Sequence, residues 1–121
     1  MSKQERYLTR KSQYKLVYDQ GGSWADGLLV LKALPNGLET SRCGFTISGH
    51  VGNAVVRNHT KRLLKELIRL TPVKPGWDMV FIARPPAAGK KFGELGESVT
   101  KLLSRADLLV GRYEEICPGI D

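Results

Sequence analysis

The chain has 121 residues, with 19 Lys and Arg against 12 Asp and Glu, which gives a formal net charge of +7 and a pI near 9.7. This length suits one domain, and 41% hydrophobic with 26% charged residues is ordinary globular usage, which excludes wholesale disorder. No apolar run approaches the ~20 residues of a membrane helix, and no secretory signal is present, so we expect a cytoplasmic protein without membrane contact.

The first helix is predicted from Ser12, as its cap, to about Gln20, where Gly21-Gly22 ends it. Residues 1–11 before it read as a mobile basic arm. Tyr14, Val17 and Tyr18 share one face of the helix by their spacing. That face fits either simple core packing or a cleft for unpaired bases.

The later elements comprise two strands that form an antiparallel hairpin across Pro35-Asn36-Gly37, a long helix, a third strand and a last helix. They span, in order, Gly27–Leu34, Arg42–Ser48, Asn53–Leu70, Asp78–Arg84 and Phe92–Leu109. In the last helix, the inward positions are Leu95, Val99, Leu102, Leu103 and Ala106. The order α-β-β-α-β-α, with room for an extra short strand near Glu39, predicts one α+β domain over residues 1–121, with a short tail at 111–121.

The long helix separates into an apolar stripe and a basic face at 100° per residue. The stripe comprises Val56, Thr60, Leu63, Leu64, Leu67 and Leu70, and the basic face comprises Arg57, Asn58, Lys61, Arg62, Lys65 and Arg69. Like charges four residues apart repel each other along this face. The face is either solvated or, as we expect from the pI, bound to a phosphate backbone that relieves the repulsion.

The chain offers no catalytic or metal-binding constellation. Cys43 and Cys117 are far apart without a CxxC pair, which favours free thiols in a reducing compartment. His50 and His59 have no carboxylate or cysteine partner at ligand spacing. We therefore predict no catalytic residue, no metal site and no protein-bound cofactor.

Four motifs occur around the long helix: Ile47-Ser48, Gly52-Asn53-Ala54-Val55, Arg57-Asn58-His59 and Lys61-Arg62. This run resembles the protein subunit of bacterial ribonuclease P, whose motifs it matches in order and without a gap. Leu8 to Tyr14 and Asp78 to Arg84 also look like the family's first helix and third strand. Two positions depart from the pattern, because His59 replaces the second arginine of the Arg-Asn-Arg box and Gly49-His50 replaces a common Lys-Lys pair.

The resemblance implies an α-β sandwich with a left-handed βαβ crossover. It also implies a protein without nuclease activity of its own, which binds a catalytic RNA and the 5′ leader of precursor tRNA while that RNA uses Mg2+ to remove the leader. The residues that match the RNA-subunit contact are Arg57, Asn58, His59, Lys61, Arg62, Lys65 and Arg69. Those assigned to the leader are Tyr14, Tyr18, Lys15 and Lys32. No obligate protein partner is expected.

Two other functions are compatible with a basic α+β domain. One is a stand-alone or ribosome-associated RNA-binding module, which composition alone does not distinguish from a ribonuclease P subunit. The other is a DNA-binding regulator that inserts residues 53–70 into a major groove. A hairpin before the long helix disfavours the second, because helix-turn-helix proteins place a short helix and a turn there.

Overall fold

The structure is a computed structural model and describes residues 7–110. Its three helices are α1 (Lys11–Gln20), α2 (Ala54–Leu70) and α3 (Phe92–Arg105). Its strands are β1 (Gly22–Ala25), β2 (Leu29–Pro35), β3 (Arg42–Ile47) and β4 (Trp77–Ala83), and single 3-10 turns lie at Gly49–Val51 and Pro85–Ala87. The predicted class, a single α+β sheet covered by helices, is confirmed.

The four strands form one mixed sheet in the order β1-β2-β4-β3. β4 pairs antiparallel with β2 and parallel with β3, so β3, α2 and β4 make the βαβ crossover. The predicted hairpin between residues 27–34 and 42–48 is therefore wrong, because β4 lies between these strands. The hairpin that forms joins β1 to β2, and the extra short strand is Gly22–Ala25 rather than a segment near Glu39.

A buried acid explains why the turn after β2 does not close a hairpin. Asp78 of β4 accepts two hydrogen bonds from the Arg42 guanidinium, at 2.8 and 2.7 Å, and one from the Asn36 amide at 2.9 Å. The same amide also donates to the Thr40 carbonyl. The Asn-Gly step is thus tied to β4, and residues 36–41 cross over that strand instead of reversing the chain beside β2.

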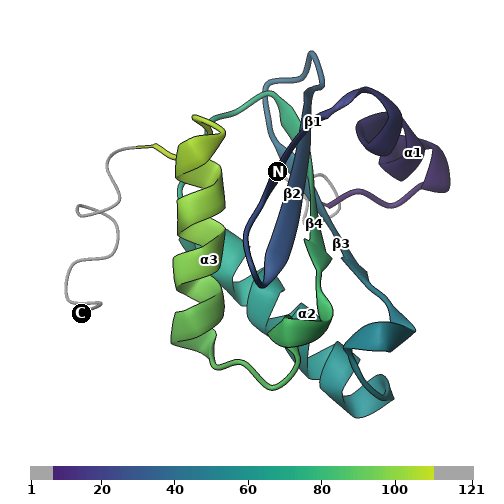
Figure 1. Ribbon diagram of the computed structural model, residues 1–121. Helices are drawn as coiled ribbons and strands as arrows, with labels where there is room; N and C mark the ends of the chain where they lie inside the picture. The colour runs from purple at the N-terminus through teal and green to yellow at the C-terminus, as the bar shows by residue number, and fades with distance from the viewer. Residues whose placement is uncertain (1–6, 111–121) are drawn as a thin grey trace.

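The helices cover the two faces of the sheet unequally (Figure 1). α2 and α3 pack on one face over a large core that includes Leu29, Leu31 and Phe81, whereas α1 lies alone on the other face. Successive residues of β4 alternate between these faces, so Phe81 joins the large core and Val80 joins the small core beneath α1.

The apolar faces of the two larger helices follow the prediction except at their C-terminal ends. α3 buries Leu95, Val99, Leu102 and Leu103 completely. α2 buries Leu64 completely and Thr60 and Leu67 almost completely. Leu70, predicted inside, is 56% exposed because α2 ends there and Ile68 packs against the core instead. α3 stops at Arg105 rather than at residue 109, since Asp107 has a φ of 59°, outside the helical region.

The segment before α1 is attached to the sheet. The Leu8 side chain is buried, and its backbone N–H donates to the Cys43 carbonyl on the edge of β3 at 3.0 Å. α1 begins at Lys11 with Arg10 as its cap, so Ser12 is not the cap, and residues 7–11 are not a free arm. The remainder of the predicted arm, the predicted tail and Cys117 lie outside the described residues.

Candidate nucleic-acid interface

The cationic side chains predicted for one face of α2 lie on the exposed side of this helix. The Asn53 side chain fixes the first turn by accepting a hydrogen bond from the Val56 N–H at 3.0 Å. From this start the helix presents Asn58, His59, Lys61, Arg62 and Lys65 as exposed residues and Arg57 as a half-buried one. Arg69 is also exposed, but both its Nε and Nη2 bond to Glu66, which partly neutralises its charge.

Arg57 differs from the other cations of α2 because part of its guanidinium is buried. Its Nε is inaccessible to solvent and has no hydrogen-bond partner among the described residues. Arg57 borders a hollow of about 240 Å³ between α2 and the end of β3, together with Phe45, Ile47, Ala54, Asn58 and Lys61. A buried donor without an acceptor costs free energy, so this hollow is suited to an anionic oxygen supplied by a ligand.

Tyr7 supports the opposite half of the basic face and was missed in the sequence, where it lies within the supposed arm. The Lys65 ammonium lies 5.3 Å from the centroid of the Tyr7 ring, within cation–π range. The ring also packs on Phe45, at 6.5 Å between centroids, and the Tyr7 backbone bridges to Cys43. In the sequence, the position of Tyr7 among lysines and arginines is the one feature that could have indicated a role in RNA binding.

Tyr14 crosses from α1 to the edge of β3. Its ring occupies the space that a side chain at Gly44 would fill, since a Cβ there would lie 2.6 Å from three ring and hydroxyl atoms. Burial raises the pKa of the Tyr14 phenol, although a hydrogen bond from the Phe45 backbone N–H acts in the opposite direction. Tyr14 is therefore a packing residue that also satisfies an edge donor of the sheet.

Tyr18 lies one turn further along the same side of α1. Its hydroxyl shares a hydrogen bond with the Thr46 hydroxyl on β3, and its ring is tilted 47° from that of Tyr14 with centroids 6.4 Å apart. Both tyrosines are half-buried around the small core of Leu8, Val17 and Val80. Core packing therefore accounts for part of each side chain, and the remainder is accessible to solvent.

The two lysines assigned to the leader have different positions. Lys32 lies on the α1 side of the sheet, beside Val80 in the register of β2 with β4, and is half-buried. Lys15 is on the solvent side of α1, where its ammonium bonds to Asp19 at 2.7 Å. Lys32 is therefore on the face of the sheet that α1 covers, and Lys15 lies three residues before Tyr18 on the exposed surface of the helix.

Within residues 7–110, no three His, Cys, Asp or Glu side chains are grouped as a metal site, and His50 and His59 are exposed. Burial raises the pKa of the Cys43 thiol, which keeps it protonated and a poor nucleophile. None of the helices in this range is both long and apolar enough to cross a membrane.

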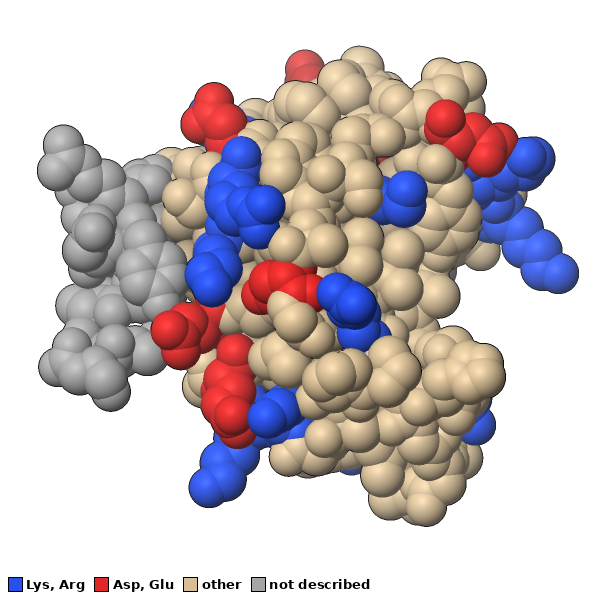
Figure 2. All heavy atoms as spheres, viewed as in Figure 1, with Lys and Arg blue, Asp and Glu red and all other residues tan. Residues whose placement is uncertain are grey.

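The side of the molecule formed by α3 and the β1–β2 hairpin has a different charge pattern. Figure 2 shows acidic and basic side chains interspersed over α3 and the β1–β2 hairpin. Asp26, Glu94 and Glu97 surround a shallow depression there with Lys101. Phosphates would meet carboxylates on this side, so the basic side of α2 is the better nucleic-acid surface.

Comparison with known proteins gives one consistent family. The family model described as Ribonuclease P matches residues 1–107. The ribonuclease P protein component of Dehalococcoides mccartyi is 48% identical over 119 residues, covering 98% of this chain and 99% of the relative. That of Roseiflexus castenholzii is 43% identical over 111 residues, covering 89% of this chain and 91% of the relative.

Solved structures show the same fold. The RNase P protein of Thermotoga maritima superposes with a TM-score of 0.73 at 27% identity, over 82% of this chain and 96% of that one. The RNase P protein of Staphylococcus aureus gives a TM-score of 0.79 at 25% identity, over 87% and 98% of the two chains.

Proposed function

This chain belongs to the ribonuclease P protein family and is a subunit of ribonuclease P, and from that premise we propose how its two functional surfaces act. The basic side of α2 binds the catalytic RNA of the enzyme. The surface between α1 and the sheet holds the unpaired 5′ leader of precursor tRNA. The protein acts in the cytoplasm and assists removal of the leader, which gives the mature 5′ end of the tRNA.

The observation that carries the first assignment is the unpartnered Nε of Arg57. Arg57, Asn58 and Lys61 line the adjoining hollow, and a phosphate oxygen there could accept from this nitrogen after a small movement of the Arg57 side chain. Arg62 and Lys65 extend the charge along the helix, while His59 adds a ring N–H donor. Arg69 contributes least, since Glu66 competes with any phosphate for it.

The α1 surface suits a single strand because it combines an aromatic, a hydroxyl and a cation. Thr46, the partner of Tyr18, lies opposite the half-buried Ile82 of β4, and the half-buried Lys32 of β2 lies opposite Val80 on the same face of the sheet. Bases can stack on the accessible part of the Tyr18 ring, and Lys32 can approach the phosphates that connect them. Tyr14 packs α1 against the edge of β3, and Lys15, three residues before Tyr18 but paired with Asp19, contributes less charge to this surface.

Catalysis in this proposal belongs to the RNA. Bound Mg2+ would activate the attacking water and stabilise the departing oxygen. The described part of the chain groups no carboxylates that could hold such an ion on the basic side of α2. The cations of α2 instead neutralise RNA phosphates, which lowers the concentration of Mg2+ that the RNA needs.

The decisive experiment is reconstitution of cleavage from purified protein, a ribonuclease P RNA and precursor tRNA at low magnesium. We expect cleavage only when protein and RNA are both present. The Arg57→Ala, Arg62→Ala double variant should reduce the log–log salt slope of RNA binding by about two, or roughly one for each lost phosphate contact. Lys101→Ala on α3 is the matched control and should leave the slope unchanged. Cleavage by RNA-free protein, or an unchanged slope in the double variant, would contradict the proposal.

A further inference from the structure

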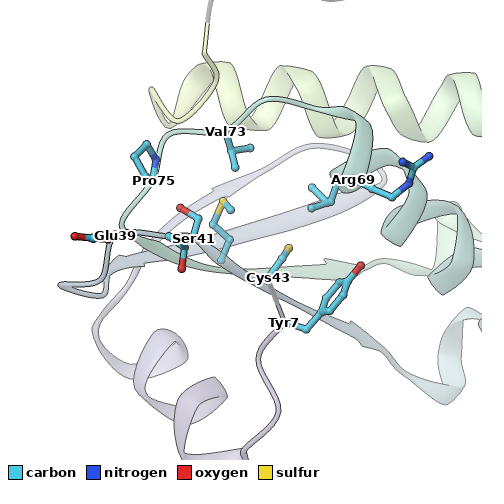
Figure 3. Close-up of a pocket in the computed structure, with 10 residues that line it drawn as sticks. Tyr7, Glu39, Ser41, Cys43, Arg69, Val73 and Pro75 are labelled. Atoms are coloured by element: carbon cyan, nitrogen blue, oxygen red, sulfur yellow. The ribbon is translucent and has the colours of Figure 1, made fainter. Parts of the chain in front are cut away.

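A second hollow lies near the C-terminal end of α2, apart from the one beside Arg57 (Figure 3). It has a volume of about 310 Å³ and opens between the N-terminal segment, the start of β3 and the loop after α2. We propose that it holds one unpaired nucleobase of the RNA bound along α2. This inference rests on the proposed function and adds a base-binding site to a surface otherwise suited to phosphates.

The interior of the hollow is apolar. Cys43 and Met79 from neighbouring strands form its floor, and Ile68, Val73 and Pro75 form its walls. Thr40 and Ser41 also line it, but the Ser41 hydroxyl already donates to the Lys74 carbonyl at 2.5 Å and accepts from the Trp77 N–H at 3.0 Å. A flat, uncharged group therefore fits between the apolar side chains better than a phosphate, which would lose its hydration there.

The rim on the α2 side is continuous with the basic face. Tyr7 and Arg69 both line the hollow, and the Lys65 ammonium lies over the Tyr7 ring. A strand of RNA whose phosphates follow α2 would pass directly over the opening. Turning one base inward at this point would bring it against apolar side chains while its phosphate stays close to Lys65.

The opposite rim carries the acid Glu39 (Figure 3). A carboxylate repels phosphate, but it accepts hydrogen bonds from the amino groups of cytosine, guanine and adenine. Lysine and arginine at one end with a carboxylate at the other match a nucleotide whose phosphate lies on α2 and whose base points away from it. The charge pattern thus favours an amino-bearing base over uracil.

The first test fills the hollow. Val73 projects into it in Figure 3, so Val73→Phe should occupy the space that a base would take. We expect the affinity for the catalytic RNA to fall about five- to a hundredfold, as expected for one stacked base, with an unchanged salt slope. Val110→Phe makes the same change at an exposed position and serves as the control. Wild-type affinity in a Val73→Phe protein with wild-type melting temperature would overturn the proposal.

The second test uses free nucleotides and does not depend on the catalytic RNA. Titration with AMP, GMP, CMP and UMP should shift the methyl NMR signals of Met79 and Val73, most weakly with UMP. Glu39→Gln, at an exposed position that should not affect folding, should reduce the difference between GMP and UMP. Absence of a methyl shift with all four nucleotides would refute the base site. If the wild-type protein showed the methyl shifts but did not bind the catalytic RNA, the proposed function would be refuted instead.

Discussion

The two faces of the sheet differ in how completely their helices cover them. On one face, α2 and α3 enclose most of the buried side chains in residues 7–110, including Phe81, Leu64 and Leu102. On the other, α1 encloses only Leu8, Val17 and Val80, and two half-buried tyrosines complete its contact with the sheet. The first face supplies most of the buried apolar area and hence most of the free energy of folding.

This difference indicates where the protein can bind ligands at little cost to its stability. A helix held by a small apolar cluster and by hydroxyl groups leaves part of the sheet accessible, as around Lys32 and Ile82. A helix buried along its full apolar stripe, such as α2, can carry an unfavourable row of cations on its exposed side. The stable face therefore bears the charge, and the weakly covered face bears the aromatic surface.

The largest effect should come from truncating the main core. Leu64 is fully buried, so Leu64→Ala should lower the free energy of unfolding by about 2–5 kcal/mol, through lost burial and the cavity left behind. Val17→Ala on the buried side of α1 should cost less, about 2 kcal/mol, because two carbon atoms are removed rather than three. Urea denaturation of both variants measures the contrast. An equal or greater loss for Val17→Ala would contradict the ranking of the two faces.

A smaller effect should come from adding one carbon beneath α1. Gly44→Ala would place a Cβ 2.6 Å from the Tyr14 side chain, and displacing the ring should cost about 1–3 kcal/mol. Gly93→Ala in α3 is the control, since its Cβ meets nothing within 4 Å and alanine favours the helix. Because α1 also carries Tyr18, we expect Gly44→Ala to weaken binding of precursor tRNA more than that of mature tRNA. If folded Gly44→Ala protein bound precursor and mature tRNA with equally reduced affinity, α1 would have no role in leader recognition.

A variant of Tyr7 tests whether the segment before α1 supports the basic side of α2 through Lys65. Tyr7→Leu should weaken catalytic-RNA binding by about 0.5–1 kcal/mol, since Lys65 loses its cation–π partner, and Tyr7→Phe should retain most of the affinity. In a Lys65→Ala background the Tyr7→Leu change should have little further effect. Additive losses in the double variant would show that Tyr7 acts independently of Lys65.

The smallest effect concerns pH and the turn between β1 and β2. Desolvation acts against the charged form of Asp26, but hydrogen bonds from Ser98 and from the Leu29 and Leu28 N–H groups outweigh it and lower the pKa. A lowered folded-state pKa contributes stability that is present above the unfolded value, about 3.9, and is lost as pH falls through the folded value. Asp26→Asn should therefore reduce the drop in melting temperature between about pH 6 and about pH 3. An unchanged drop would mean that other carboxylates dominate acid unfolding.

The sequence was most informative where local pattern decides the structure. The apolar stripe and the basic face of α2 depend on spacing along one helix, so Thr60, Leu64 and Leu67 were predicted correctly. The strand neighbours were not, because pairing of β2 with β4 brings together residues more than forty positions apart, and the Asn-Gly signal is local. Asp78, whose contacts tie the turn to β4, looked like an ordinary strand-end acid.

The candidate site shows the same division. The position of Lys32 on the α1 face follows from alternation along a strand, and the basic residues of α2 follow from helical spacing. The buried Nε of Arg57 and the place of Tyr7 under Lys65 depend on how α2 approaches the edge of β3. Such approaches are set by packing between distant segments and leave no periodic signal in the sequence.

The central position of β4 has a consequence for synthesis of the chain on the ribosome. Among residues 7–110, β4 is the last strand to be made, yet it lies between β2 and β3, so neither strand has its inner neighbour until residues 77–83 have emerged. A nascent chain that ends within α2 would expose the unpaired edges of two apolar strands, a state prone to misassociation. We therefore expect folding to be a single late event, slowed by pairings distant in sequence, rather than a stepwise addition of elements.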